Sequence, residues 1–423
     1  MMRLILAAYG GGVVSMESGR ELVAAVRRLD VQAVTVLLEE GADPHTVADD
    51  GLPVLCLAVA AYDTAVAGAL VEGGADPDRV LPDATTPLLR AVDGGSWAMT
   101  KAHLGDDPQR LPEAERGRLL ALARRWYEQG AKAVLRDRAR KFGPVREECV
   151  EDGEDGTVVQ LTFGGLTVRD GHGAILTELE CAFDIHTPVD ELVARAMAAP
   201  QEEWDHVDWN SAVAAVAVRQ DTETFLAVTA YRHHPDPDRR HFVLDVFDDY
   251  RKQFYRNIFS KQGIPFVKET ADVLIAWATE GEESPNVLTR VLSDLGFVRH
   301  PELQAVGLRH AGHPDPRVRA ETTDLIFDWG NWSTPQGAAK DALLLLAADE
   351  NPRVRRRAGS TLIVGDDGTS GFTEALVALL QDPDFEVRKD MAEGIKSFSD
   401  EPRTPPVAAA LAGVWDEIGA ADG

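Results

Sequence analysis

The sequence repeats Gly41-Ala42-Asp43-Pro44 after 33 residues as Gly74-Ala75-Asp76-Pro77. Apolar residues follow the same offset in two further series, namely Leu22, Leu55 and Leu88, and Ala25, Ala58 and Ala91. A period of this length is typical of helical-repeat proteins, in which one helix pair cannot bury its apolar face alone and therefore stacks on the next. The repeat thus predicts an elongated stack of helix pairs.

The ends of each repeat have a simple physical explanation. Gly41 and Gly74 can adopt the left-handed backbone conformation that closes a helix, and the Asp-Pro pair then turns the chain. Thr86 is expected to cap the following helix, with Pro87 at its first position. The 33-residue period, the Thr-Pro-Leu opening and the Gly-Ala-Asp-Pro closing resemble ankyrin repeats over about residues 18–140.

A second repeated pattern lies in the C-terminal half of the chain. Three segments share it and end in Val-Arg: His313–Arg319, Asp349–Arg355 and Asp382–Arg388, with a degenerate earlier copy at His234–Arg240. They resemble the Asp-Pro-x-x-x-Val-Arg signature of HEAT repeats. The resemblance implies that proline starts the second helix of a pair, valine points into the core and arginine meets an acidic residue of a neighbouring repeat.

These patterns predict an all-α fold with two helical-repeat solenoids, ankyrin-like and then HEAT-like. We expect five regions: an N-terminal extension 1–15, ankyrin-like repeats 16–144, an acidic linker 145–156, a connecting region 157–204 and HEAT-like repeats 205–423. The linker is expected to be solvated because it is charged and contains glycine. Next to it, Gly164-Gly165 between two apolar runs predicts a small β-hairpin of Thr157–Phe163 and Leu166–Val168.

Composition restricts the classes of partner. The formal net charge of −27 disfavours attraction to nucleic acid or anionic lipid, and no apolar run is long enough for a membrane span. A basic partner would be attracted instead. The three cysteines have no CxxC pairing, which fits a reducing cytoplasm better than secretion. Scarce lysine beside abundant arginine and alanine indicates a high-GC bacterial genome.

No motif predicts an enzyme. The chain has no HExxH, GxSxG or P-loop sequence, and none of its 11 histidines has metal-ligand spacing with a third ligand in view. His234 and His313 occupy equivalent repeat positions in the turn before a helix, where capping is expected. We therefore expect no catalytic residue, no cofactor and no metal site.

The segment Tyr250–Lys268 is basic and aromatic and holds no acidic residue. Four of its residues are candidates for partner binding: Arg251, Lys252, Tyr255 and Arg256. Interleaved aromatic and basic side chains could stack bases and contact phosphates, as in the HEAT-like class of DNA glycosylases. The alternative is that the aromatic residues are core, and that the basic residues pair with the preceding acidic group Asp245, Asp248 and Asp249.

Two tryptophans, Trp329 and Trp332, lie in a predicted turn between helices. If exposed, they would be candidate anchors for a protein partner, because interface hot spots favour tryptophan. Burial under the following helix is the other interpretation.

The sequence therefore predicts a non-enzymatic, cytoplasmic scaffold that binds a protein or peptide on its concave repeat surfaces. The acidity favours a basic partner, and an immunity, antitoxin-type or regulatory role is one specific hypothesis. The alternative function is nucleic-acid binding or processing through residues 250–268. Neither function fixes the identity of the partner.

Overall fold

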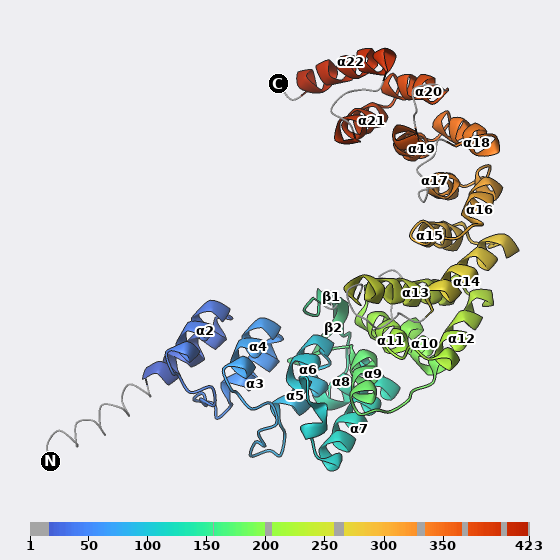
Figure 1. Cartoon of the computed structure of the whole chain (residues 1–423). Coiled ribbons are helices and arrows are strands. Elements are labelled where there is room, and N and C mark those ends of the chain that lie inside the picture. The colour runs from blue at the N-terminus through green and yellow to red at the C-terminus, as the bar shows by residue number, and fades with distance from the viewer. Residues whose placement is uncertain are drawn as a thin grey trace, which may run out of the picture. The chain divides into compact units, whose positions relative to one another are not determined.

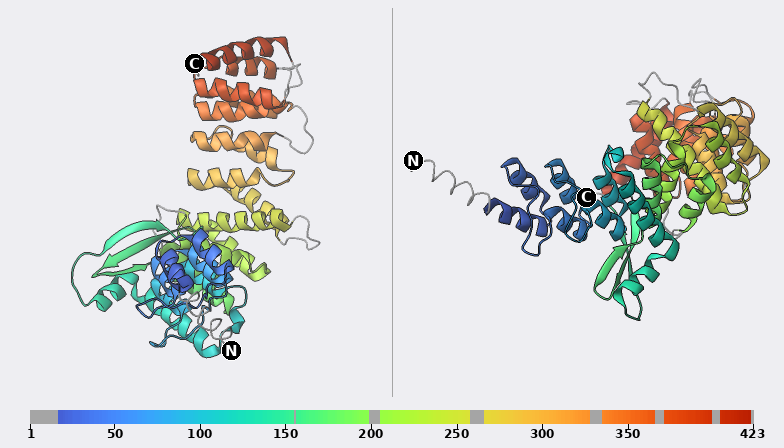
Figure 2. Two further views of the ribbon diagram at one scale, coloured as in Figure 1. Left: turned by 90° about the vertical axis from the view of Figure 1, so that its left-hand side faces the viewer. Right: turned by 90° about the horizontal axis from the view of Figure 1, so that it is seen from below.

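The computed structural model describes residues 17–154, 156–198, 205–257, 266–327, 335–365, 371–398 and 404–421 (Figures 1 and 2). The fold is all-α apart from one small sheet, as the sequence predicts. The chain divides into two compact units, Met1–Arg219 (unit 1) and Gln220–Gly423 (unit 2). This division does not coincide with the expected start of the second repeat region at residue 205.

Unit 1 consists of short helices around a three-stranded antiparallel sheet. A first helix covers residues 17–27. The helices that follow are α2 (Val31–Glu39), α3 (Val54–Ala61), α4 (Thr64–Glu72), α5 (Pro87–Gly94), α6 (Trp97–Leu104), η1 (Pro108–Arg110), α7 (Glu113–Gln129), α8 (Ala131–Ala139), α9 (His172–Ala182), α10 (Val189–Ala198) and α11 (Val207–Ala217). Helices α3, α5 and α7 pack side by side in one layer, and α2, α4 and α6 pack side by side in the other. This is the arrangement of stacked helix pairs.

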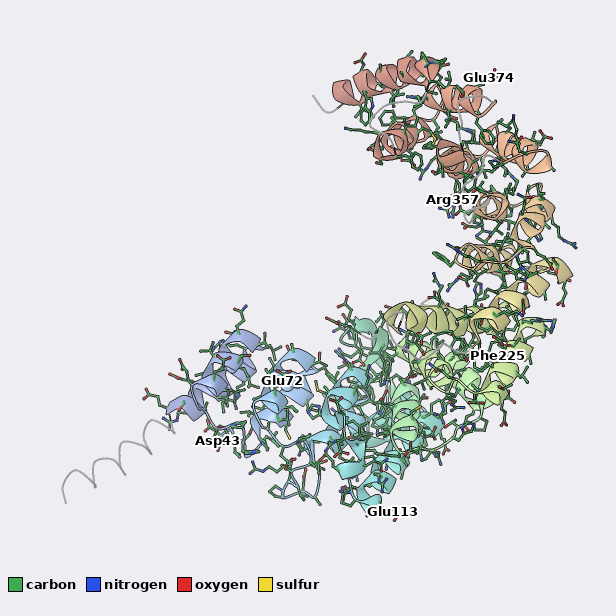
Figure 3. The ribbon with its side chains drawn as sticks, in the orientation of Figure 1. Asp43, Glu72, Glu113, Phe225, Arg357 and Glu374 are labelled. Carbon is green, nitrogen blue, oxygen red and sulfur yellow. The ribbon has the colours of Figure 1, made fainter. Side chains whose placement is uncertain are left out.

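The 33-residue repeat is also present in the backbone. Gly41 and Gly74 have φ of 93° and 99°, which is the left-handed region expected for a glycine after a helix. Asp43 and Asp76 (Asp43 is labelled in Figure 3) each accept a hydrogen bond of 2.9 Å from the amide two residues ahead. Thr86 caps α5 by accepting from the amide of Leu89, which confirms the predicted cap.

The predicted hairpin is present, but the predicted acidic linker is wrong. Strands β2 (Thr157–Phe163) and β3 (Leu166–Arg169) flank two glycines with positive φ. Residues of the linker form a third strand, β1 (Arg146–Glu151), which pairs antiparallel with β2. The exposed glutamates of β1 gave it the composition of a solvated segment, yet its backbone is held by an apolar neighbouring strand.

Unit 2 consists of helix pairs in chain order. Its elements are α12 (Thr222–Ala230), η2 (Tyr231–His233), α13 (Pro237–Asn257), α14 (Val267–Glu280), α15 (Pro285–Leu295), α16 (Leu303–His310), α17 (Pro316–Ile326), α18 (Ala338–Ala347), α19 (Pro352–Gly365), α20 (Gly371–Leu380), α21 (Phe385–Phe398) and α22 (Pro405–Ala421). Helices α13, α15, α17, α19 and α21 form one layer of contacts, and α14, α16, α18, α20 and α22 form the other.

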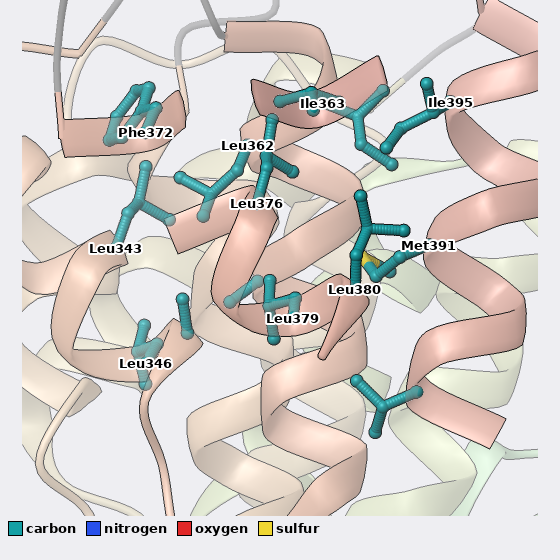
Figure 4. Close-up of a cluster of buried hydrophobic side chains, with 14 of the residues drawn as sticks. Leu343, Leu346, Leu362, Ile363, Phe372, Leu376, Leu379, Leu380, Met391 and Ile395 are labelled. Atoms are coloured by element: carbon teal, nitrogen blue, oxygen red, sulfur yellow. The ribbon is translucent and has the colours of Figure 1, made fainter. Parts of the chain in front are cut away.

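The core of unit 2 is continuous between successive pairs. Figure 4 shows side chains from α18, α19, α20 and α21 pointing toward one another, among them Leu343, Leu362, Phe372, Leu376 and Met391, all at most 2% exposed. Each helix contributes a stripe of apolar residues that no single pair could bury. Stability is therefore distributed along the stack.

Arginines connect successive repeats of unit 2 in the way that the repeated motif predicts. Arg319 pairs with Asp349 at 2.7 Å and also donates to the carbonyl oxygens of His313 and Pro314. Three equivalent pairs complete this arginine ladder: Arg240 with Glu282, Arg355 with Asp382 and Arg388 with Glu417. Each arginine thus closes its own turn and binds the next repeat. The pair made by Arg240 confirms that the degenerate copy at His234–Arg240 is a true repeat.

The ladder has one gap. In the repeat of α15, Leu288 stands where the other repeats have the arginine. In the next repeat, His313 stands where the others have the acidic partner. Both partners of the pair are therefore replaced together. Leu288 is buried at 2% exposure, so an apolar side chain stands in the joint between α15 and α17 at the point where the other joints carry the arginine ion pair.

Replacing Arg355 by methionine is expected to reduce the free energy of unfolding of unit 2 by about 2 kcal/mol, because the largely buried Asp382 loses two charge-assisted hydrogen bonds. Burial by itself raises the pKa of Asp382, while hydrogen bonds from Arg355 bring that pKa below its ordinary value. Urea unfolding of the full chain with hydrogen exchange of α19 and α21 measures the loss. Arg353→Met, an exposed neighbour on α19, is the control and should change stability by less than about 0.5 kcal/mol.

A buried carboxyl group in unit 1 predicts a pH dependence. Asp208 of α11 accepts a 2.6 Å hydrogen bond from the amide of Ala174, so it caps the first turn of α9 from another helix. Burial raises the pKa of Asp208 to about 7, and nearby Asp170 adds to the effect. The folded protein therefore holds one proton more than the unfolded chain between about pH 4 and pH 7, and stability falls as pH rises through that window.

Asp208→Asn removes this titration while keeping an oxygen that can accept from Ala174. Relative to the wild type, the variant should gain about 2–3 kcal/mol of stability between pH 4 and pH 7, with most of the gain present at pH 7. Unfolding measured at a series of pH values, with the exposed Asp137→Asn as control, gives this difference. If the free energy of unfolding of the variant differed from that of the wild type by the same amount at every pH in the window, the carboxyl group would not be protonated in the folded state.

Candidate protein-binding surface

The predicted basic residues of α13 are held by acidic neighbours. Arg251 donates to Asp248, and the Lys252 Nζ lies 3.0 Å from the same carboxylate. Burial alone raises the pKa of Asp248, but the hydrogen bonds from Arg251 and Lys252 bring it below its ordinary value. These pairs favour the interpretation in which the basic residues neutralise the preceding acids, over the one in which they contact phosphates.

The aromatic residues of the same segment belong to the core where their side chains are described. Tyr250 is 5% exposed, and Phe266 stacks on Phe225 of α12 with ring centroids 4.6 Å apart (Phe225 is labelled in Figure 3). Phe225 also stacks on Phe247 at 5.9 Å. These rings stabilise the packing of α12, α13 and α14. Phe247 and Tyr250 also reach the wall of a neighbouring pocket.

The other candidate residues stay predictions. Tyr255 and Arg256 lie in the last turns of α13, but only their backbone is described. Trp329 and Trp332 lie outside the described residues. The structure therefore brings Arg251 and Lys252 together at one carboxylate and does not test whether the remaining four residues join them.

A pocket of about 650 Å³ opens between α13, α14 and α15, next to Arg251. Its apolar and aromatic lining is Phe247, Tyr250, Val267, Ala271, Leu274, Phe297 and Val298. Its polar and charged lining is Asp248, Arg251, Lys268, Glu269, Thr270, Asp294, Arg299 and His300. A second hollow of about 560 Å³ shares residues 296–300, so Phe297 lies at the boundary of both. Phe297 is 56% exposed and Val267 is 46% exposed, which places two large apolar side chains at this surface.

Ion pairs satisfy most of the charges around this pocket. Arg290 contacts Asp245 and Asp294 at 3.2 Å each, and the Arg251 guanidinium lies 4.0 Å from the centre of the Phe297 ring. Burial raises the pKa of Asp294 to about 6 against the opposing charge of Arg290. His300 Nε2 lies 3.3 Å from Asp272. Asp248, Arg251 and Asp294 are thus engaged within the chain, while Lys268, Glu269 and Arg299 add charge to the lining. The surface therefore offers a partner an apolar patch surrounded by polar and charged groups, which is the usual composition of a protein interface.

The histidines at the repeat turns have a structural role. His234 and His313 each accept a hydrogen bond from the amide two residues ahead through Nδ1, at 3.1 and 3.0 Å. Asp349 and Asp382 make the same contact in the following repeats. Over the described ranges of the chain, no group of three or more His, Cys, Asp or Glu side chains is arranged to hold a metal ion.

Sequence reasoning missed Phe297, Val267, Arg290 and Asp294. Phe297-Val298 follows Gly296 at the end of α15, so the only signal was an apolar pair placed just after a helix-terminating glycine. The exposure of that pair depends on how α14 and α15 meet, which is a long-range property of the stack.

None of the helices that the structure describes is long and apolar enough to cross a membrane.

Comparison with known proteins gives no family. No family model and no curated protein matches the chain. Among solved structures, a chain of the Pds5-Scc1 complex, described with implications for cohesin function, is similar over 97% of this chain and 67% of its own length. The sequence identity is 15% and the TM-score is 0.37. The helix pairs and the arginine ladder themselves define the repeat architecture.

Proposed function

We propose that this chain is a scaffold that binds a protein partner through the pocket surface of unit 2. The observation that carries the proposal is the exposure of Phe297 and Val267 at the edge of a 650 Å³ pocket in which Asp248, Arg251 and Asp294 are held in ion pairs. Burying two large apolar side chains against a partner is favourable, whereas breaking the internal ion pairs would not be. A partner that inserts an apolar side chain beside Phe297 fits this surface.

The net charge of −27 supports a basic partner, because opposite charge accelerates encounter and disfavours wrong partners. An immunity, antitoxin-type or regulatory role stays the more specific form of the proposal. Nucleic-acid binding through residues 250–268 receives no support from the ion pairs of Arg251 and Lys252. That alternative predicts binding to DNA at low salt that weakens steeply as salt is added.

The test begins with capture of partners by the tagged full-length chain from extracts of its own cells, followed by affinity measurement with the purified partner. Phe297→Ala should weaken that affinity at least about tenfold, as expected for an aromatic hot spot. Leu226→Ala is the matched control, because Leu226 is 62% exposed on α12 and does not line the pocket. The control should leave the affinity within about twofold.

Two results would count against the proposal. Equal affinities of the Phe297→Ala and Leu226→Ala proteins would show that the partner binds elsewhere. Recovery of nucleic acid without a stoichiometric protein, lost in Lys252→Glu, would support the alternative function. Thermal unfolding of both variants checks that each one remains folded.

A further inference from the structure

Unit 1 contains a basic region that runs against the charge of the whole chain. Residues 110–146 carry eleven basic and four acidic residues, within a protein of net charge −27. Charges separated by more than about 8–10 Å are largely screened at physiological salt, so a partner that contacts this region responds to the local charge. The local charge here is positive.

Some of these cations are already neutralised. Arg138 pairs with Asp93 at 2.6 Å, Arg124 with Glu180 at 2.9 Å and Lys132 with Glu147 at 2.7 Å. Within the described part of the chain, Arg125 has no ion-pair partner, and Arg118 reaches only the exposed Glu115 at 3.9 Å. Positive charge is therefore left over on the outer face of α7, whose first residue Glu113 is labelled in Figure 3.

These residues border a groove between α5 and α7. The groove has a volume of about 410 Å³, with Leu89 and Leu122 as apolar walls and Arg90, Arg118 and Arg125 as cationic lining. A neighbouring hollow of about 440 Å³ on α7 shares Ala121 and Arg125 with it. We call the first hollow, with its three arginines, the arginine groove.

In the arginine groove Arg90 is fixed in place by an ion pair, so the uncompensated positive charge comes from Arg118 and Arg125. Arg90 is held by Asp83 at 2.8 Å and by the Thr85 hydroxyl at 2.9 Å. Asp93, the acidic residue of the lining, already accepts two hydrogen bonds from Arg138 and one from the Trp126 indole. Burial alone raises the pKa of Asp93, but these hydrogen bonds hold it below its ordinary value, so it stays ionised and engaged.

We propose that the arginine groove binds an acidic protein segment in which carboxylates flank an apolar side chain. Arginine forks recognise carboxylates with two parallel hydrogen bonds, and the walls of Leu89 and Leu122 suit an aliphatic side chain between them. Nucleic acid fits less well because none of the described residues that line this groove is aromatic, so no ring is available there to stack on a base. This site goes beyond the proposed function, since it lies in unit 1 and selects a partner of the opposite charge.

The probe is a fluorescein-labelled peptide made of three copies of Glu-Leu-Glu-Gly, with versions carrying glutamine or lysine in place of glutamate. Binding to the full chain is measured by fluorescence anisotropy at low salt. The glutamate peptide should bind, the glutamine peptide should bind at least about tenfold more weakly, and the lysine peptide should not bind through the groove. The affinity should fall as salt is added.

The charge reversal Arg118→Glu with Arg125→Glu should weaken the glutamate peptide at least about tenfold. Its matched control is Arg27→Glu with Arg28→Glu, which makes the same change of charge at exposed residues at the end of the first helix and should leave binding within about twofold. The groove variant and its control should both leave binding that depends on Phe297 unchanged, which separates this inference from the proposed function.

Four results would overturn the inference. The first is no binding of the glutamate peptide, and the second is equal binding of the glutamate and glutamine peptides. The third is an equal loss of affinity for the glutamate peptide in the groove variant and in its control. The fourth is tighter binding of a single-stranded oligonucleotide than of the peptide, with that binding lost in the same groove variant. This result would assign the groove to nucleic acid.

Discussion

Asp152→Ala is expected to destabilise unit 1 by about 3–5 kcal/mol, because it leaves a buried guanidinium without its counter-charge. Asp152 is completely buried and accepts hydrogen bonds from the Ser96 hydroxyl at 2.5 Å, the Ala98 amide at 3.0 Å and Arg169 at 2.5 Å. One carboxylate therefore joins the turn after β1 to the start of α6 and to the end of β3.

Hydrogen exchange of the full chain, read separately for α6 and for β1–β3, measures this loss in the unit where it occurs. Glu148→Ala is the control, since Glu148 lies on the adjoining strand β1 with a half-exposed side chain that pairs with Arg146. The control should change stability by less than about 0.5 kcal/mol. A loss below about 1 kcal/mol in Asp152→Ala would mean that water replaces the carboxylate and that the sheet is not clamped to α6.

Arg195→Leu is expected to have an effect of similar size, about 3–5 kcal/mol. Arg195 is fully buried and contacts Glu180 at 2.7 Å, Glu191 at 2.5 Å and the Thr177 hydroxyl at 3.0 Å. Without it, Glu180, whose side chain is 3% exposed, keeps only Thr187 and the solvent-facing Arg124. Burial then dominates, and the pKa of Glu180, held below its ordinary value by Arg195, should rise.

The double variant Arg195→Leu with Glu180→Leu should recover much of the lost stability, because an apolar pair can replace a buried ion pair. Chemical unfolding of the full chain, followed by the exchange of α9 and α10, measures all three proteins. Arg136→Leu on the exposed face of α8 is the control. A double variant less stable than the single one would show that Glu180 is held by other groups.

The repeats were readable from the sequence because they are local and recur. The Val-Arg copies predicted the arginine ladder, and the Gly-Ala-Asp-Pro copies predicted the turns, since each depends on residues a few positions apart. Strand β1 was not readable, because its glutamates resemble those of a solvated linker. What fixes β1 is the apolar strand β2 and the distant group around Asp152, and neither leaves a signal within β1 itself.

The binding surfaces were less predictable than the fold. Arg251 and Lys252 were identified as basic, but their pairing with Asp248 and the exposure of Phe297 depend on how three helices meet. The basic composition of residues 110–146 was visible in the sequence and could have been found by counting charges in successive windows. Its grouping into a groove between α5 and α7 required the structure.

The gap in the arginine ladder gives unit 2 an uneven response to mechanical load. Ion pairs and hydrogen bonds break over short extensions, whereas apolar contacts slide and yield more gradually. The joint at Leu288 should therefore be the most compliant one in the stack, because it lacks the arginine ion pair of the other joints. When the chain is stretched from its two ends in an optical trap, the pairs before and after Leu288 should separate there first. Tension transmitted through a bound partner would then extend the stack mainly at this one joint.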